Sequence, residues 1–363
     1  MRRIEGIDLA RGLAVLGMVT AHVGPGEPDD PLPWSLTQIA DGRSAALFVL
    51  LSGVSVALMT GGPRPPTGIR AVQGRVKVLS RAFVLLALGV GLAVLNVPVV
   101  VILPTYALLF AVAACLLRTS ITRLLVGAGV VLLIAAPLRV LVTGRITANW
   151  NGGGIVDLVL GEYYPALVWI VYLLVGLAIA RADLTAAGTR VGMLIGGAIA
   201  TVLGYGSAAV LTRLWDPATV VVNSAEFPVV LDDLITSAPH SSTVFEVLGN
   251  IGVGLLTLVA CMWLAERWPR AMAPLAATGA LALTAYVGHI LVIWLVGSQL
   301  VWEATVGGWL AFIIVIVGGC WAWRAGVGRG PAEWVLHRIA TRAADIAPDQ
   351  LPERTVESIV TPR

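Results

Sequence analysis

Long apolar segments recur along the whole chain and constrain its fold more than any other feature. A helix needs about 20 mostly apolar residues to cross the hydrocarbon core of a bilayer. Of the 363 residues, 58% are hydrophobic and only 12% are charged, which is more apolar surface than one soluble core could enclose. The sequence therefore predicts an all-α, polytopic membrane protein with about ten transmembrane helices. The predicted spans are 7–23, 44–62, 78–96, 98–117, 122–143, 163–181, 190–212, 244–265, 275–297 and 305–324.

Basic residues gather on one side of the predicted membrane, which fixes the expected orientation. Lysine and arginine accumulate in the cytoplasmic loops of membrane proteins. With the N-terminus inside, the segments on that side contain Arg2, Arg3, Arg64, Arg70, Arg75, Lys77, Arg81, Arg118, Arg123, Arg181, Arg190, Arg267 and Arg270. Acidic residues concentrate instead in the two long external loops, 24–43 and 213–243. The sequence thus predicts cytoplasmic N- and C-termini and a location in the cell inner (plasma) membrane.

The remaining segments fit one domain with a short tail. Residues 1–344 form the predicted transmembrane helical domain, and 345–363 are polar and are expected to be a disordered cytoplasmic tail. The segment 153–161 is too short to span and is expected to be interfacial or re-entrant. Residues 330–344 are typical of an amphipathic helix on the cytoplasmic surface.

Several classes of function are disfavoured by the same patterns. The net charge of +3 arises from loops between apolar runs, so it does not indicate nucleic-acid binding. The three cysteines, Cys115, Cys261 and Cys320, lie inside apolar runs and show neither a disulfide framework nor a metal spacing. The sequence contains no phosphate-binding P-loop and no dinucleotide glycine motif. We therefore expect no metal and no permanently bound cofactor.

The first predicted helix carries three ionisable residues on one face. Asp8, Arg11 and His22 fall within about 80° on a helical wheel, and His22 lies about 21 Å along the axis from Asp8. Ionisable residues within a span are costly and are often functional. Two interpretations remain open. Asp8 and Arg11 form an ion pair that fixes helix packing, or the three residues form a polar seam between a cytoplasmic donor site and an external histidine.

Three of the four histidines are predicted on the external half. Besides His22, these are His289, with Tyr286 one turn below it, and His240 in the external loop. Histidine titrates near neutral pH and can deprotonate a hydroxyl or amine. Each of the three is a candidate general base, and each has the alternative of a purely structural role. His337 is expected on a solvated cytoplasmic face.

Five basic residues cluster in the predicted cytoplasmic segment 63–81. They include Arg75 and Lys77, which are candidates to bind the phosphates of a nucleotide-bearing donor. The alternative is that this charge only directs membrane orientation.

Five sequence blocks, in order, resemble two related groups of membrane proteins. These are the heparan-α-glucosaminide N-acetyltransferase-like proteins and the YeiB-like bacterial family. The blocks are RRIEGIDLARGLAVLGMVTAH, ADGRSAALFVLLSGVSVAL, YYPALVWIVYLLVGLAIARADL, TGALALTAYVGHILVIW and GRGPAEWVLHR, which together extend over residues 2–338. The resemblance implies a transmembrane acyltransferase, most simply an acetyltransferase. Such an enzyme takes an acyl group from cytoplasmic acetyl-CoA or another acyl-CoA to an envelope sugar or lipid-linked acceptor outside.

The resemblance also implies site residues, with one departure. Trp34 and Asp41 are similar to residues that accompany a catalytic histidine in the lysosomal enzymes, but the position of that histidine falls near Pro31. The base is therefore His22, His240 or His289, or it is absent.

We expect His22 as the base, with Asp41 orienting it or stabilising its charge. We expect Asp8 and Arg11 at the donor mouth, and Arg75 or Lys77 on the donor phosphates. The expected partners are the bilayer, the acyl-CoA and an envelope glycan or glycolipid, and a homodimer is compatible with the pattern. A transporter that uses the polar seam, or a non-catalytic membrane protein, is the alternative.

Overall fold

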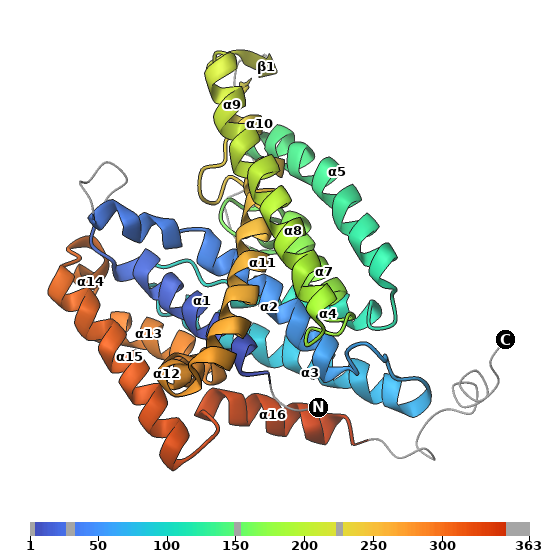
Figure 1. Ribbon diagram of the computed structural model, residues 1–363. Coiled ribbons are helices and arrows are strands. Elements are labelled where there is room, and N and C mark those ends of the chain that lie inside the picture. Colours follow the sequence, from blue (N-terminus) through green and yellow to red (C-terminus); the bar gives the residue numbers. More distant parts are fainter. Residues whose placement is uncertain (1–3, 27–32, 149–153, 223–227, 346–363) are drawn as a thin grey trace.

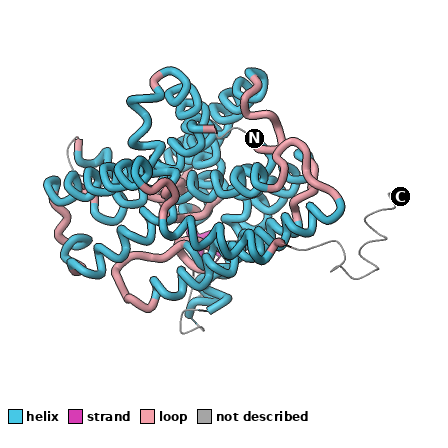
Figure 2. The backbone as a smooth tube through the Cα atoms, turned by 90° about the horizontal axis from the view of Figure 1, so that it is seen from below, coloured by secondary structure: helices cyan, strands magenta, loops and turns pink. Residues whose placement is uncertain are grey.

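The computed structural model describes residues 4–26, 33–148, 154–222 and 228–345, and these are helical almost throughout (Figures 1 and 2). The first half contains α1 Glu5–Val23, the 3₁₀ helix η1 Trp34–Ala40, α2 Arg43–Met59, α3 Gly68–Ala93, α4 Leu103–Cys115, α5 Ile121–Ala148, α6 Gly154–Leu160 and α7 Ala166–Ile179. The second half contains α8 Ala187–Thr201, the π-helical turn η2 Val202–Gly206, α9 Ser207–Leu214, α10 Asp232–Ile235, α11 Val244–Arg267, α12 Pro269–Ala280, α13 Ala282–Val296, α14 Gln299–Trp302, α15 Val306–Gly326 and α16 Pro331–Ala343. The short strands β1 Val220–Val222 and β2 Val229–Val230 pair antiparallel, a detail that the all-α prediction lacked.

Every predicted span contains a helix, but not every helix has the length of a full span. Seven helical segments are long and apolar enough to cross a membrane, and the bent pair α12–α13 brings the number to eight if it is one span. The other two predicted spans contain α4, with 13 residues, and α7, with 14. Length and composition of the described residues therefore support seven or eight candidate spans, not ten.

The basic segment 63–81 differs from its prediction. It was expected as a loop, but α3 begins at Gly68, so Arg70, Arg75, Lys77 and Arg81 lie on helix. At about 100° per residue, Arg70, Lys77 and Arg81 fall within roughly 40° of one another on one face of α3, whereas Arg75 points away from that face. Four of the five basic residues are therefore held on a helix and not in a loop.

Close backbone contact joins α1 to α12 near the start of α1. A Cβ on Gly279 would overlap the carbonyl oxygen of Asp8, and one on Gly12 would overlap that of Leu275. Small residues allow membrane helices to approach this closely, and the close packing gives them van der Waals contact. The start of α1 is thus fixed against α12, with α11 and α2 on its other sides.

The predicted span 275–297 consists of two helices, because the chain bends by 70° between α12 and α13. The bend leaves backbone N–H groups at the start of α13 without helical partners. The carboxylate of Glu333, from α16, accepts hydrogen bonds from the N–H groups of Leu283 (2.7 Å) and Thr284 (3.0 Å). A negative charge at a helix N-terminus is also favoured by the helix dipole. The predicted amphipathic helix at 330–344 therefore stabilises the break, and α16 also packs against α3 (Figure 1).

Candidate active site

Helix α1 connects two polar regions at opposite ends of the bundle. We call the end where α1 begins the inner end and the end where it finishes the outer end. The inner end contains a cavity of about 1370 Å³, lined by residues from the start of α1, from α2 and α3, from α11 and from the α7–α8 connection. Four arginines line it, namely Arg11, Arg64, Arg81 and Arg190, together with four carboxylates, Glu5, Asp8, Asp183 and Glu266. We call it the basic cavity after its arginines.

Asp8 and Arg11 meet as an ion pair at the wall of the basic cavity. The guanidinium of Arg11 lies 2.7 Å from the Asp8 carboxylate and donates a second hydrogen bond to the hydroxyl of Ser55, also 2.7 Å long. Asp8 is buried, whereas 24% of the Arg11 side chain is exposed. The ion pair joins α1 to α2 through Ser55, as expected of a packing contact. Arg11 also lines the cavity, so its guanidinium is not restricted to that contact.

The basic residues expected on the donor phosphates are not the ones that line this cavity. Arg75 is exposed on α3, and neither Arg75 nor Lys77 belongs to the lining. Arg81, one helical turn beyond Lys77, does line it. Its buried Nε atom has no hydrogen-bond partner among the described residues. A buried unpaired donor is costly, so this position favours an anionic ligand.

Two histidines from distant parts of the chain meet at the outer end. Nδ1 of His22, one residue before the end of α1, lies 3.1 Å from Nε2 of His289 on α13. The rings are stacked, with centroids 5.3 Å apart and planes at 13°. His289 is buried, and its ring also contacts that of Tyr286. The contact uses Nδ1 of His22 and does not involve its Nε2.

A third histidine lies in the same region and pairs with Asp41. Nε2 of His240 is 3.0 Å from the carboxylate of Asp41, and Nδ1 is 3.3 Å from the carbonyl oxygen of Tyr163. Both ring nitrogens thus face acceptors, so both contacts are hydrogen bonds only when the ring is a protonated imidazolium. Burial disfavours the charged ring, but the hydrogen bond and charge of Asp41, with the charge of Glu246, outweigh it and raise the pKa of His240.

The loop that carries His240 is held in an uncommon backbone conformation. His240 has a φ of 62°, which few residues other than glycine adopt. The buried carboxylate of Glu246 accepts hydrogen bonds from the backbone N–H groups of His240 (2.9 Å) and Ser242 (2.6 Å). The hydroxyl of Thr243 caps α11 by accepting from the N–H of Glu246. Glu246 therefore positions His240.

A buried arginine fixes this loop against its neighbour. The guanidinium of Arg139, on α5, donates to the carbonyl oxygens of Ser241 (2.8 Å), Gly161 (3.1 Å) and Glu162 (3.0 Å). Sequence reasoning missed both Glu246 and Arg139. The Thr-x-x-Glu pattern before an apolar run is a helix-start signature that could have identified Glu246. Arg139 sits in an apolar run with no such signal.

A small cavity of about 200 Å³ lies between His22 and the His240–Asp41 pair, and we call it the outer cavity. His22, Asp41 and His240 line it, together with Tyr163 and Tyr164. The structure thus brings together the three expected external histidines and Asp41. It differs from the expectation in one contact, because Asp41 hydrogen-bonds His240 whereas the ring of His22 contacts His289.

The Pro31 position lies outside the described residues. In the part of the chain that the structure describes, no group of three or more His, Cys, Asp or Glu side chains is arranged to hold a metal ion.

A polar pocket at each end of one apolar helix is the arrangement expected of an enzyme that works across a membrane. The chain matches the family described as an acyltransferase domain over residues 4–324, and it therefore belongs to that family of membrane-bound acyltransferases. It is a multi-pass membrane protein and an enzyme, which decides against the transporter alternative. No curated protein matches the chain.

Proposed function

We propose that the chain transfers an acetyl or similar acyl group from a cytoplasmic acyl-CoA to a hydroxyl or amine in the cell envelope. The observation that carries this proposal is the outer cavity, where His22 offers a ring nitrogen beside the His240–Asp41 pair. The basic cavity lies at the other end of the same helix. The resemblance to the heparan-α-glucosaminide N-acetyltransferase-like and YeiB-like proteins supports an envelope sugar or glycolipid as acceptor.

The basic cavity suits the donor. Coenzyme A is an anion with three phosphates, and guanidinium groups bind phosphate oxygens through charge-assisted hydrogen bonds. Arg64 and Arg81 line the cavity and have no carboxylate ion pair among the described residues, whereas Arg190 pairs with Glu266 at 2.5 Å. We assign the donor phosphates to Arg64 and Arg81, with Arg11 at the inner mouth. Arg11 and His22 are about 16 Å apart along α1. The flexible chain between the phosphates and the thioester of the donor must therefore extend along the helix to reach His22.

The outer cavity suits the transfer step. The acceptor gives its proton to the free nitrogen of His22, and its oxygen or nitrogen attacks the thioester carbonyl carbon. Negative charge develops on the carbonyl oxygen, and the imidazolium of His240 stabilises it. The carbon–sulfur bond then breaks, and the thiolate takes the proton from His22. His289 holds the ring of His22, and Asp41 keeps His240 protonated.

The orientation follows the basic residues, with the inner end and both termini in the cytoplasm. We count ten crossings by including the two shorter helices. The described side chains of α7 are almost all buried by neighbouring helices, so protein rather than lipid covers much of this short span. The tail 345–363 is assigned to the cytoplasm, although 346–363 lie outside the described residues.

Sided membrane vesicles test function and orientation together. Inverted vesicles, with the cytoplasmic face outward, are expected to transfer labelled acetyl from added acetyl-CoA to membrane-associated material. Right-side-out vesicles should not, because the charged donor cannot reach the basic cavity. Vesicles from cells lacking the protein give the background. Transfer by right-side-out vesicles alone would contradict the orientation, and transfer by neither preparation would contradict the proposed reaction.

Asp41→Asn is expected to shift the pH dependence. The pKa of His240 is raised in the folded protein. The stabilisation from the charged His240–Asp41 pair is therefore fully present below the unfolded pKa of about 6.5, and it is lost as pH rises through the higher folded-state pKa. Removing the carboxylate charge lowers that pKa, so the alkaline loss of activity and of thermal stability should begin at lower pH. The measurements are pH–rate profiles and melting temperatures, with Asp216→Asn in the exposed outer loop as control. An unchanged alkaline limb would contradict the charged pair.

A further inference from the structure

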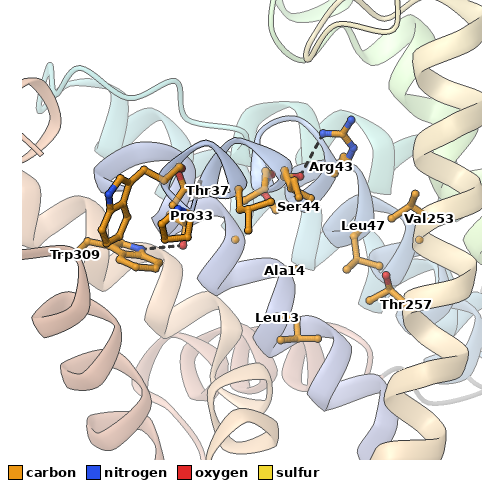
Figure 3. Close-up of a pocket in the computed structure, with 17 residues that line it drawn as sticks. Leu13, Ala14, Pro33, Thr37, Arg43, Ser44, Leu47, Val253, Thr257 and Trp309 are labelled. Carbon is orange, nitrogen blue, oxygen red and sulfur yellow. Dashed lines mark hydrogen bonds between the residues drawn. The ribbon is translucent and has the colours of Figure 1, made fainter. Parts of the chain in front are cut away.

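An apolar groove, shown in Figure 3, lies next to the outer cavity and shares Ser44 with it. It has a volume of about 570 Å³ and is bounded by α1, η1, α2, α11 and α15. Leu13, Ala14, Leu47 and Val253 form much of its wall, and we call it the outer groove. Its size is typical of small-ligand pockets, which span roughly 300–1,000 Å³. Its walls suit a hydrocarbon chain, not a free sugar.

Part of the wall of the outer groove belongs to a candidate membrane span, because η1 and α2 together form the apolar segment Trp34–Met59. Leu13 on α1 and Ile39 on η1 both line it, and 57% of Ile39 is exposed. In a membrane protein, such exposed apolar side chains face hydrocarbon. Trp309 lies at one end of the groove (Figure 3), Trp34 also lines it, and tryptophan is enriched at the level of lipid head groups. A membrane lipid can therefore reach the groove without crossing water.

One cation lies at the rim of the outer groove. Arg43 is the single charged residue among the described residues that line it. Its guanidinium lies 4.9 Å from the ring centre of Tyr205, hydrogen-bonds the side chain of Tyr205 and donates a long, 3.4 Å hydrogen bond to the carbonyl oxygen of Ile39. No carboxylate of the described chain forms an ion pair with it. A guanidinium above an apolar wall complements a lipid whose head group carries a phosphate.

The outer groove adjoins the outer cavity. Ser44 lines both, and on α1 Gly17 faces the groove while Met18 faces the cavity. A Cβ on Gly17 would overlap the side chain of Ser44, so α1 and α2 touch closely between the two spaces. A lipid in the outer groove would therefore be separated from the outer cavity only by this contact between α1 and α2.

We propose that the outer groove binds the hydrocarbon tail of a phosphate-bearing membrane lipid, with its phosphate on Arg43, and that this lipid carries the acceptor group. The assignment rests on the proposed acyl transfer and names its acceptor class. The new bond joins the acyl carbon to a head-group oxygen. The proton of that hydroxyl passes to His22 and leaves with the donor sulfur as a thiol.

Lipid binding by the purified full-length protein tests the groove without any transfer reaction. Phosphatidylglycerol is the probe, diacylglycerol lacks the phosphate, and occupancy is measured by native mass spectrometry. Arg43→Gln is expected to weaken phosphatidylglycerol binding roughly tenfold and to leave diacylglycerol binding unchanged, as loss of one charge-assisted hydrogen bond predicts. Arg213→Gln, at another arginine near the outer end, is the matched control. Equal effects of the two variants would overturn the role of Arg43.

Filling the groove tests the tail site. Leu13→Trp should reduce binding of both lipids, while Leu295→Trp, at an exposed position on α13 that does not line the groove, should not. Both variants leave the buried core unchanged, and unaltered melting temperatures would verify folding. Unchanged lipid binding by Leu13→Trp would overturn the groove assignment.

The distribution of the transferred label tests the acceptor class. In the inverted-vesicle reaction, labelled acetyl should extract into organic solvent with the lipids, and less of it should appear with Leu13→Trp. Label found only in water-soluble or insoluble glycan would overturn the lipid acceptor while the acyl transfer stands. Absence of any label would contradict the transfer itself, and the binding measurements would still decide whether the groove holds lipid.

Discussion

His22→Ala is expected to reduce acyl transfer by about 10²–10⁴-fold, the usual contribution of a general base. The loss should appear in the rate constant of transfer and not in donor affinity, because the basic cavity lies at the other end of α1. His22→Gln keeps hydrogen-bonding capacity but cannot accept a proton in this pH range, so it should be nearly as slow. The measurement is transfer of labelled acetyl by inverted vesicles that contain equal amounts of each variant.

A matched variant separates catalysis from general damage. His337→Ala removes the one histidine outside the outer site, on the exposed face of α16, and should transfer at the wild-type rate. Wild-type turnover by His22→Ala would exclude His22 and leave His240 or His289 as the base. His289→Ala is expected to transfer at a rate between those of His22→Ala and His337→Ala, because it removes only the residue that holds the ring of His22.

Asp8→Ala should destabilise the protein by up to about 3–5 kcal/mol, the cost of leaving one charge of a buried pair uncompensated. Asp8 is 3% exposed, and its carboxylate lies 2.7 Å from the Arg11 guanidinium. The double change Asp8→Ala/Arg11→Ala removes the unpaired charge as well and should be the milder of the two. Melting temperatures of the purified variants in detergent test the order.

An exposed ion pair at the same cavity provides the control. Glu266 pairs with Arg190 at 2.5 Å, but 58% of the Glu266 side chain is exposed. Glu266→Ala should therefore cost no more than about 1 kcal/mol. If the losses from Asp8→Ala and Arg11→Ala simply add in the double variant, the two side chains do not stabilise each other.

The placement of the helices could be predicted because each needs only local information. An apolar run of sufficient length must be helical in lipid, since no water is available for backbone groups. The sequence accordingly predicted a helix in every span and the amphipathic helix α16. It mispredicted the start of α3 and the bend at Leu281, because both depend on neighbours. The bend between α12 and α13 is stabilised by the carboxylate of Glu333, which lies 50 residues from Leu283 in the sequence.

The candidate site was predictable in its residue types but not in its pairings. One face of α1 contains Asp8, Arg11 and His22, and helical geometry alone gives this alignment. Asp41 was expected to orient His22, yet it pairs with His240, a residue 199 positions away. Arg75 and Lys77, which were expected on the donor phosphates, do not line the basic cavity, for a related reason. Membership of a basic segment does not say which side chain faces a cavity, and the lining of that cavity includes Arg81 instead.

By itself, the sequence determined that this chain is a helical membrane protein whose polar residues lie at two ends of one apolar helix. Those properties follow from hydrophobicity and helix periodicity, which are local. Only the tertiary structure decided that His22 stacks on His289, that Asp41 holds His240, and that an apolar groove adjoins them. Contacts of this kind depend on how separate helices pack, and packing depends on shape complementarity between residues far apart in the chain.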